Sequence, residues 1–232
     1  MSLVNIVLLI IVSGIVISLN PLSISVFLSL MAGALGKGHS HKRFLLVTFL
    51  FLSTFAAILA ILGFTIIRVF NLMSTDLLAS VSIAIAVATI LFGLISIKDY
   101  FWYDRRIKIP AEIQDLLHSK TMKQNNPYSS INLGAVTAFA SLANTGILLL
   151  TLSTILALSG QGGDFLMILP ALCFVVPLVV ILTLVSNGTK ISALIKWKED
   201  SKPTMRLETG LMHIILAWIL LLMLNGSIGS IL

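Results

Sequence analysis

Six long apolar runs constrain the fold of this chain more than any other feature of its sequence. A helix needs about 20 mostly apolar residues to cross the hydrocarbon core of a bilayer, and each run meets that length. The first run is longer than one span requires, which favours a helix bent at Pro21. The runs lie at residues 3–35, 44–70, 77–97, 131–159, 165–187 and 208–230. The sequence therefore predicts an all-α membrane protein with six transmembrane helices.

The charged residues indicate how these spans are oriented. Only 10% of the residues are charged, whereas soluble domains carry about 25%, so a water-soluble fold is excluded. All but one of the 15 Lys and Arg residues lie in three segments, 36–43, 98–130 and 188–207. Positively charged loops stay in the cytoplasm, so both termini are expected outside it, N-out and C-out. The basic residues form no stripe with interleaved aromatic residues, so no nucleic-acid partner is expected.

The six spans divide into two halves of three. Residues 1–97 are expected to form one three-helix repeat and residues 131–232 a second. Because each half has an odd number of spans, a duplication places the halves in opposite orientations, the inverted-repeat plan of many carriers. Residues 98–130 form a cytoplasmic loop, in which Pro110 opens a short amphipathic helix on the inner leaflet. An alternative interpretation of this loop is a docking site for a partner.

A polar interruption in the first run, Asn20-Pro21-Leu22-Ser23, is the first half of a candidate binding site. Pro21 removes one backbone donor and clashes with the preceding turn, so the helix is expected to break there. The freed backbone groups need polar partners, which the bilayer core does not supply. Asn20 and Ser23 are expected to supply them.

A second interruption, Ala143-Asn144-Thr145-Gly146, lies at the corresponding place in the fourth run. Paired helix breaks near the membrane midplane form the binding sites of many transporters. We therefore expect the two interruptions to face each other and to bind a solute between them. The alternative is that both are ordinary kinks, whose small residues let helices pack closely.

The remaining polar residues offer fewer candidates. Glu208 and His213 stand near the start of the sixth run, and His213 is a candidate for proton or substrate coupling. His39 and His41 form a weak metal clip, which the neighbouring positive charges oppose. The sequence has no phosphate-binding loop, nucleophile elbow or zinc-helix motif, so no enzyme activity, cofactor or metal is expected.

The two interrupted runs resemble motifs of a known family. The CcdA proteins and the membrane domain of DsbD, within the LysE-type superfamily, carry Asn/Thr-Pro-Cys in the first span and Pro-Cys-Thr-Gly in the fourth. Here Leu19-Asn20-Pro21-Leu22 resembles the first motif, and the segment Leu142–Gly146 resembles the second. The stretches Gly93–Tyr103 and Ile107–Pro110 also resemble the end of the third span and the start of the next loop in one branch of the family.

The resemblance implies a transmembrane electron carrier, but this chain departs from the family at the reactive positions. Family members move reducing equivalents outward by thiol–disulfide exchange, in which a thiolate attacks a disulfide. Leu22 and Asn144 stand at the two cysteine positions, and Cys173 is the only cysteine of the chain. We therefore expect the redox reaction to be absent and the scaffold to be retained.

These expectations point to two functions. The first is a carrier in a prokaryotic plasma membrane that moves a small uncharged or weakly polar solute by alternating access, because no charged residue is near either interruption in the sequence. The alternative is a non-transporting membrane subunit of a thiol-redox or cytochrome c maturation system. Such a subunit acts through a thioredoxin-like or membrane redox partner.

Overall fold

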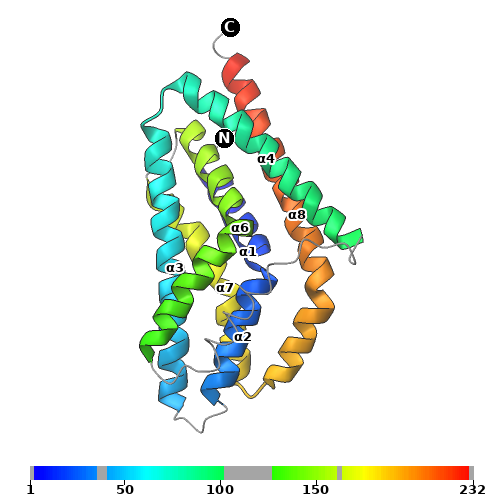
Figure 1. The fold of residues 1–232 in the computed structure, drawn as a ribbon. Helices are drawn as coiled ribbons and strands as arrows, with labels where there is room; N and C mark the ends of the chain where they lie inside the picture. The colour runs from blue at the N-terminus through cyan, green and yellow to red at the C-terminus, as the bar shows by residue number, and fades with distance from the viewer. Residues whose placement is uncertain (1–2, 36–40, 102–126, 161–163, 230–232) are drawn as a thin grey trace.

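The computed structural model describes residues 3–35, 41–101, 127–160 and 164–229, and nearly all of them are helical (Figure 1). No strand occurs within these residues, which confirms the all-α prediction. The helix predicted after Pro110 lies outside the described residues. The elements are α1 (Leu3–Ser18), α2 (Pro21–Leu35), α3 (His41–Asn71), α4 (Thr75–Phe101), α6 (Pro127–Ser159), the short 3-10 helix η2 (Asp164–Met167), α7 (Ile168–Ser186) and α8 (Ile191–Gly229).

Four described helices, α3, α4, α7 and α8, are long and apolar enough to cross a bilayer on their own. Two further spans are bent. α1 and α2 meet at 62°, and the two arms of α6, Tyr128–Leu142 and Thr145–Ser159, meet at 72°. The described chain therefore has four candidate spans, or six if each bent pair is one span.

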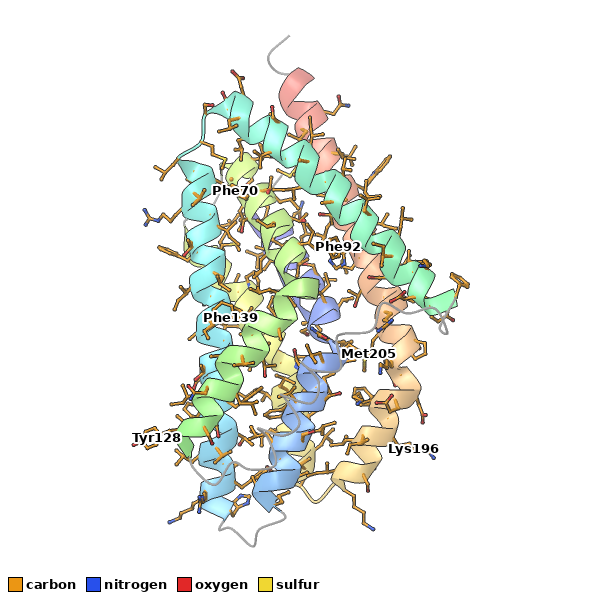
Figure 2. All side chains as sticks on the ribbon, in the orientation of Figure 1. Phe70, Phe92, Tyr128, Phe139, Lys196 and Met205 are labelled. Carbon is orange, nitrogen blue, oxygen red and sulfur yellow. The ribbon has the colours of Figure 1, made fainter. Side chains whose placement is uncertain are left out.

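The outer surface of the bundle is apolar, as a lipid-facing surface must be. Large hydrophobic side chains that are exposed include Phe49 on α3, Leu91 on α4, Leu172 on α7 and Trp218 on α8. Figure 2 shows side chains of this kind projecting outward along α3 and α4. Soluble proteins rarely expose contiguous apolar surface on this scale. The surface therefore supports a multi-pass membrane protein.

The bent pair of α1 and α2 occupies the centre of the bundle. The two helices together contact α3, α6, α7 and α8. The most extensive packing joins α3 to α6 on one side and α4 to α8 on the other, and α1 packs along α7 (Figure 1). The first interruption of the sequence is thus surrounded by the other spans.

Helix α8 is longer than the sequence predicted. The segment 188–207 was expected to be a cytoplasmic loop before a span that starts near residue 208, but α8 begins at Ile191 and runs through Pro203. Buried Leu194, Lys198 and Met205 lie on one face of this first part of the helix, at spacings that match helical turns. Lys196 projects from its outer side (Figure 2). The prediction failed because the charges of this segment were taken as the mark of a loop.

Two glycines bring α4 and α8 into backbone contact. A Cβ atom placed on Gly93 would lie 2.9 Å from the carbonyl oxygen of Gly210, and one on Gly210 would lie 2.8 Å from the carbonyl oxygen of Gly93. Both distances are too short for a methyl group. Helices in a membrane associate through close packing of small residues, because lipid provides no hydrophobic drive between them. Gly93 and Gly210 therefore set the spacing of this helix pair.

Replacing Gly210 by alanine is expected to push α4 and α8 apart and to lower stability by about 1–3 kcal/mol, the usual cost of overpacking. The measurement is thermal unfolding of the purified protein in detergent. Gly226→Ala is the matched control, because it lies on the same helix and a Cβ there meets nothing within 4 Å. Equal stability of the two variants would contradict the close approach.

Candidate functional site

The side chain of Asn20 caps the first turn of α2 at the break between α1 and α2. Leu22 N–H donates to Asn20 Oδ1 at 3.0 Å, and Ile24 N–H donates to the carbonyl oxygen of Asn20 at 3.1 Å. Asn20 is therefore the N-cap of α2, and Pro21 is its first residue. Proline fits that position because the missing N–H has no partner within the helix anyway. Pro21 thus starts a new helix, whereas the sequence analysis placed it inside a helix that it disrupts.

The polar groups at the end of α1 have partners within their own helix. Ser13 Oγ donates to the carbonyl oxygen of Leu9 at 2.6 Å, and Ser18 Oγ donates to that of Ile15 at 2.5 Å. These hydroxyls donate to helical carbonyls, so their single donors are already used. The serine side chains in the second half of α1 therefore offer a solute no free hydrogen-bond donor.

Two buried polar atoms at the start of α2 are different. Asn20 is 5% exposed and Ser23 is 3% exposed. Asn20 Nδ2 and Ser23 Oγ have no hydrogen-bond partner among the described residues. The sequence analysis expected both side chains to serve the broken backbone, which Asn20 does through Oδ1 and Ser23 does not do through its hydroxyl. A buried polar atom without a partner costs about 1–3 kcal/mol, so such atoms require an explanation.

The second interruption is a bend in a helix that continues. Helix α6 passes through residues 143 and 144 without a gap, and the side chains of Ala143 and Asn144 lie outside the described part of the structure. Thr145 is buried, and its Oγ1 donates to the carbonyl oxygen of Ser141 at 3.0 Å, across the bend. The two interruptions therefore differ in construction, one a capped new start and the other a flexed helix.

Both interruptions belong to the interior of the bundle. Asn20, Ser23 and Thr145 are buried, Pro21, Leu22 and Gly146 are buried or half-buried, and α1 and α2 each contact α6. Neither interruption is turned out toward lipid through these residues. That the two together line one solute site stays a prediction.

An open groove of about 370 Å³ lies beside the second interruption, between α3, α4 and α6. Leu142 and Gly146 line it together with Leu62, Phe92 and other apolar residues, and no residue of the first interruption reaches it. Its lining offers no side-chain hydrogen-bonding group. This groove is therefore not the polar pocket between two breaks that the sequence analysis expected.

A buried cation that the sequence analysis missed lies against α2. Lys198 is 8% exposed, and its Nζ donates to Ser25 Oγ at 2.8 Å and lies 2.6 Å from Glu199 Oε1. Ser25 is little more than one turn beyond the break. The sequence analysis found no charge near either interruption because it assigned 188–207 to a loop. The helical spacing of Leu194, Lys198 and Met205 was the signal that would have placed Lys198 on a buried face.

His213 lies deeper than the sequence analysis expected. It is 2% exposed and sits well inside α8, where its Nδ1 lies 2.7 Å from the carbonyl oxygen of Thr209. A Cβ atom on Gly93 would lie 3.3 Å from His213 Cβ, so this residue faces α4. Glu208, one of the two residues expected near the start of this span, is exposed. Closer to the start of α8, Arg206 Nη1 forms an ion pair with Asp99 Oδ2 at 2.6 Å, which also joins α8 to α4.

Cys173 and the described histidines belong to no cluster of metal ligands. Cys173 is buried on α7 against Gly14 of α1, where a Cβ on the glycine would lie 2.6 Å from Cys173 Cβ. Among the described residues, no three His, Cys, Asp or Glu side chains gather into a metal-ligand set. His39, one of the two histidines considered as a weak metal clip, lies outside them. The polar groups of the described interior are mainly hydroxyls and the Asn20 amide, together with His213 and the cation Lys198.

Comparison of the chain with protein-family models, with curated proteins and with solved structures gave no match. The function is therefore inferred from the geometry of the chain itself.

Proposed function

We propose that the protein is a membrane carrier that moves a small uncharged or weakly polar solute by alternating access. The observation that carries this proposal is the capped break at Asn20, which leaves two unpaired polar atoms inside an apolar bundle. Irregular backbone within a membrane is tolerated where it is buried in protein or lines a cavity, and carriers use such breaks to bind solutes. The bend of α6, which contacts both α1 and α2, supplies the second half of the site.

The proposed architecture is an inverted repeat of three spans, and part of the helix packing supports it. The contacts of α6 with α8 and of α2 with α3 have no counterpart of similar extent in the described residues. A two-fold axis in the membrane exchanges the α1–α2 pair with α6, α3 with α7, and α4 with α8. It maps the packing of α3 on α6 onto that of α1 on α7, and both contacts occur. It also maps α4 on α6 onto α8 on the α1–α2 pair, and both occur. The axis maps α4–α8 onto itself, which matches the reciprocal approach of Gly93 and Gly210.

We keep the resemblance to the CcdA and DsbD family as part of the proposal. Its support is positional, because the bent spans are the first and the fourth, where that family carries its two motifs. Leu22 lies at the first cysteine position and is a half-buried apolar side chain. Cys173 is buried between helices and has no second thiol in the chain. The scaffold without the thiol pair is therefore the form of the family that we propose.

The proposed location is a prokaryotic plasma membrane with both termini outside the cytoplasm. In Figure 1, α1 begins and α8 ends toward the upper end of the view. The connections from α2 to α3 and from α7 to α8 lie at the lower end. The basic residues Lys42, Arg43 and Lys190 stand at that lower end of the chain path. Cytoplasmic loops carry such an excess of positive charge.

His213 is proposed to couple proton or solute movement, on the support of its burial within α8.

Purified protein in liposomes is expected to raise the flux of small neutral solutes, such as glycerol and urea, above that of protein-free vesicles. Osmotic swelling followed by light scattering measures this flux. Asn144→Leu is expected to lower it about tenfold, because one lost hydrogen bond in the binding site costs about 1.4 kcal/mol. Ser53→Leu is the matched control, because Ser53 is exposed on α3 and donates to its own helix.

Unchanged flux in a well-folded Asn144→Leu protein would remove the second interruption from the solute path. Absence of any flux, together with stoichiometric co-purification of a thioredoxin-like protein, would favour the non-transporting alternative.

The orientation predicts which positions can be labelled from outside the cell. In a Cys173→Ala background, Leu72→Cys between α3 and α4 is expected to react with a membrane-impermeant maleimide on intact bacterial cells. Ser192→Cys at the start of α8 is expected to react only after lysis. Both native side chains are exposed, so access is limited by the membrane alone. Val87→Cys, exposed in the middle of α4, is the control that stays unlabelled in both states. The reverse pattern for Leu72 and Ser192 would invert the topology.

A further inference from the structure

The chemical identity of the unpaired group on Asn20 is fixed by its neighbour. Leu22 N–H is a donor, so the amide atom that faces it at 3.0 Å must be the oxygen. The atom left without a partner is therefore the NH₂ nitrogen, which can only donate. Because Oδ1 lies over the first turn of α2, Nδ2 on the same amide lies at that end of the helix too.

Ser23 adds a second buried polar atom in the first turn of α2. Asn20 is the N-cap of α2 and Ser23 follows three residues later, a spacing that brings two side chains to one face of a helix. The Ser23 hydroxyl carries one donor and has no partner among the described residues. The start of a helix also carries a partial positive charge of about half a unit, which favours negative charge nearby. The Asn20 NH₂ group and the helix start favour an incoming hydrogen-bond acceptor, and the Ser23 hydroxyl can donate to the same acceptor.

Five of the six helices that form or contact the break carry no carboxylate. The described helices α1, α2, α3, α6 and α7 contain no Asp or Glu side chain. The sixth, α8, carries Glu199, which is paired with Lys198. The lysine that reaches α2, Lys198, brings positive charge, which Glu199 partly balances. A cationic group placed at the start of α2 would therefore lose its hydration and gain no carboxylate in return.

We propose that the start of α2 binds the acceptor oxygen of the carried solute, such as the carbonyl oxygen of a neutral amide, through Asn20 Nδ2 and Ser23 Oγ, and that it rejects cations of the same size. This proposal rests on the proposed carrier function and names the class of solute for it. A buried water molecule that bridges the two side chains is the competing explanation, because water commonly satisfies such groups.

Acetate, acetamide and acetamidinium test the proposal, because the three probes have nearly the same shape and differ in charge and in hydrogen-bonding groups. The measurement is the rise in melting temperature of the detergent-purified protein with each probe, at matched ionic strength. A ligand that binds the folded state raises the melting temperature. We expect acetate and acetamide to stabilise the wild-type protein and acetamidinium not to do so.

Asn20→Asp is the decisive variant. Aspartate caps a helix as well as asparagine does, so the variant keeps the cap and replaces the NH₂ donor with an acceptor oxygen. Its response to acetate is expected to need roughly tenfold more probe, and acetamidinium is expected to stabilise it. Acetamide, which carries both an acceptor and a donor, is expected to stabilise both proteins. Comparing the variant with wild type cancels any general effect of each probe on protein stability. Ser18→Ala is the matched control, since Ser18 is buried beside the break and already donates to Ile15.

The outcomes separate the explanations. Equal or absent responses to acetate and to acetamidinium in wild type and Asn20→Asp would leave the buried-water explanation and overturn the proposal, as would a wild-type preference for acetamidinium. If Asn20→Asp does not fold, Ser23→Ala replaces it and is expected to weaken the response to acetate and acetamide by a similar factor. The expected binding pattern without flux in liposomes would refute the carrier function and leave the site standing. Flux without the pattern would refute the site alone.

Discussion

One hydrogen bond, from the N–H of Leu22 to the side-chain oxygen of Asn20, stabilises the point inside the bundle where α1 has ended and α2 begins. Each backbone group that loses its helical partner in a membrane must find another within the protein, because hydrocarbon supplies none. Asn20 provides that partner, and Pro21 reduces by one the number of donors that need it. The 62° change of direction between α1 and α2 therefore leaves fewer backbone donors without a partner at the break.

The position of this break determines what surrounds it. α1 and α2 together contact α3, α6, α7 and α8, so the polar atoms at the break are enclosed by helices on several sides. Small residues allow these helices to come close. Gly14 lies against Cys173 of α7, and Gly134 of α6 lies against the backbone of Phe51 on α3. Gly14 lies six residues before Asn20, and Gly134 lies nine residues before Ala143, so each bent span has a close glycine contact on the N-terminal side of its interruption.

The sequence was sufficient for those features that depend on long apolar runs and on local chemistry. The all-helical class and the bent first span follow from hydropathy, length and the Asn-Pro pair. The sequence also led to the expectation that Asn20 serves the freed backbone, but not to the new helix start at Pro21. The extent of α8 did not follow, because a charged segment such as 191–207 is helical here through the burial of Leu194, Lys198 and Met205 against the bundle. The approach of Lys198 to Ser25 likewise joins residues far apart in the chain, which no local pattern specifies. The missing partner of Ser23 is also a property of its surroundings and not of its type.

The most direct test of this account is electron-microscopy density for the protein in lipid nanodiscs. The account predicts two separate helices that meet at about 62° at residues 19–20, with the Asn20 side chain over the first turn of α2 and inside the bundle. A single straight helix through residue 20, or an Asn20 side chain that faces the acyl chains, would contradict it.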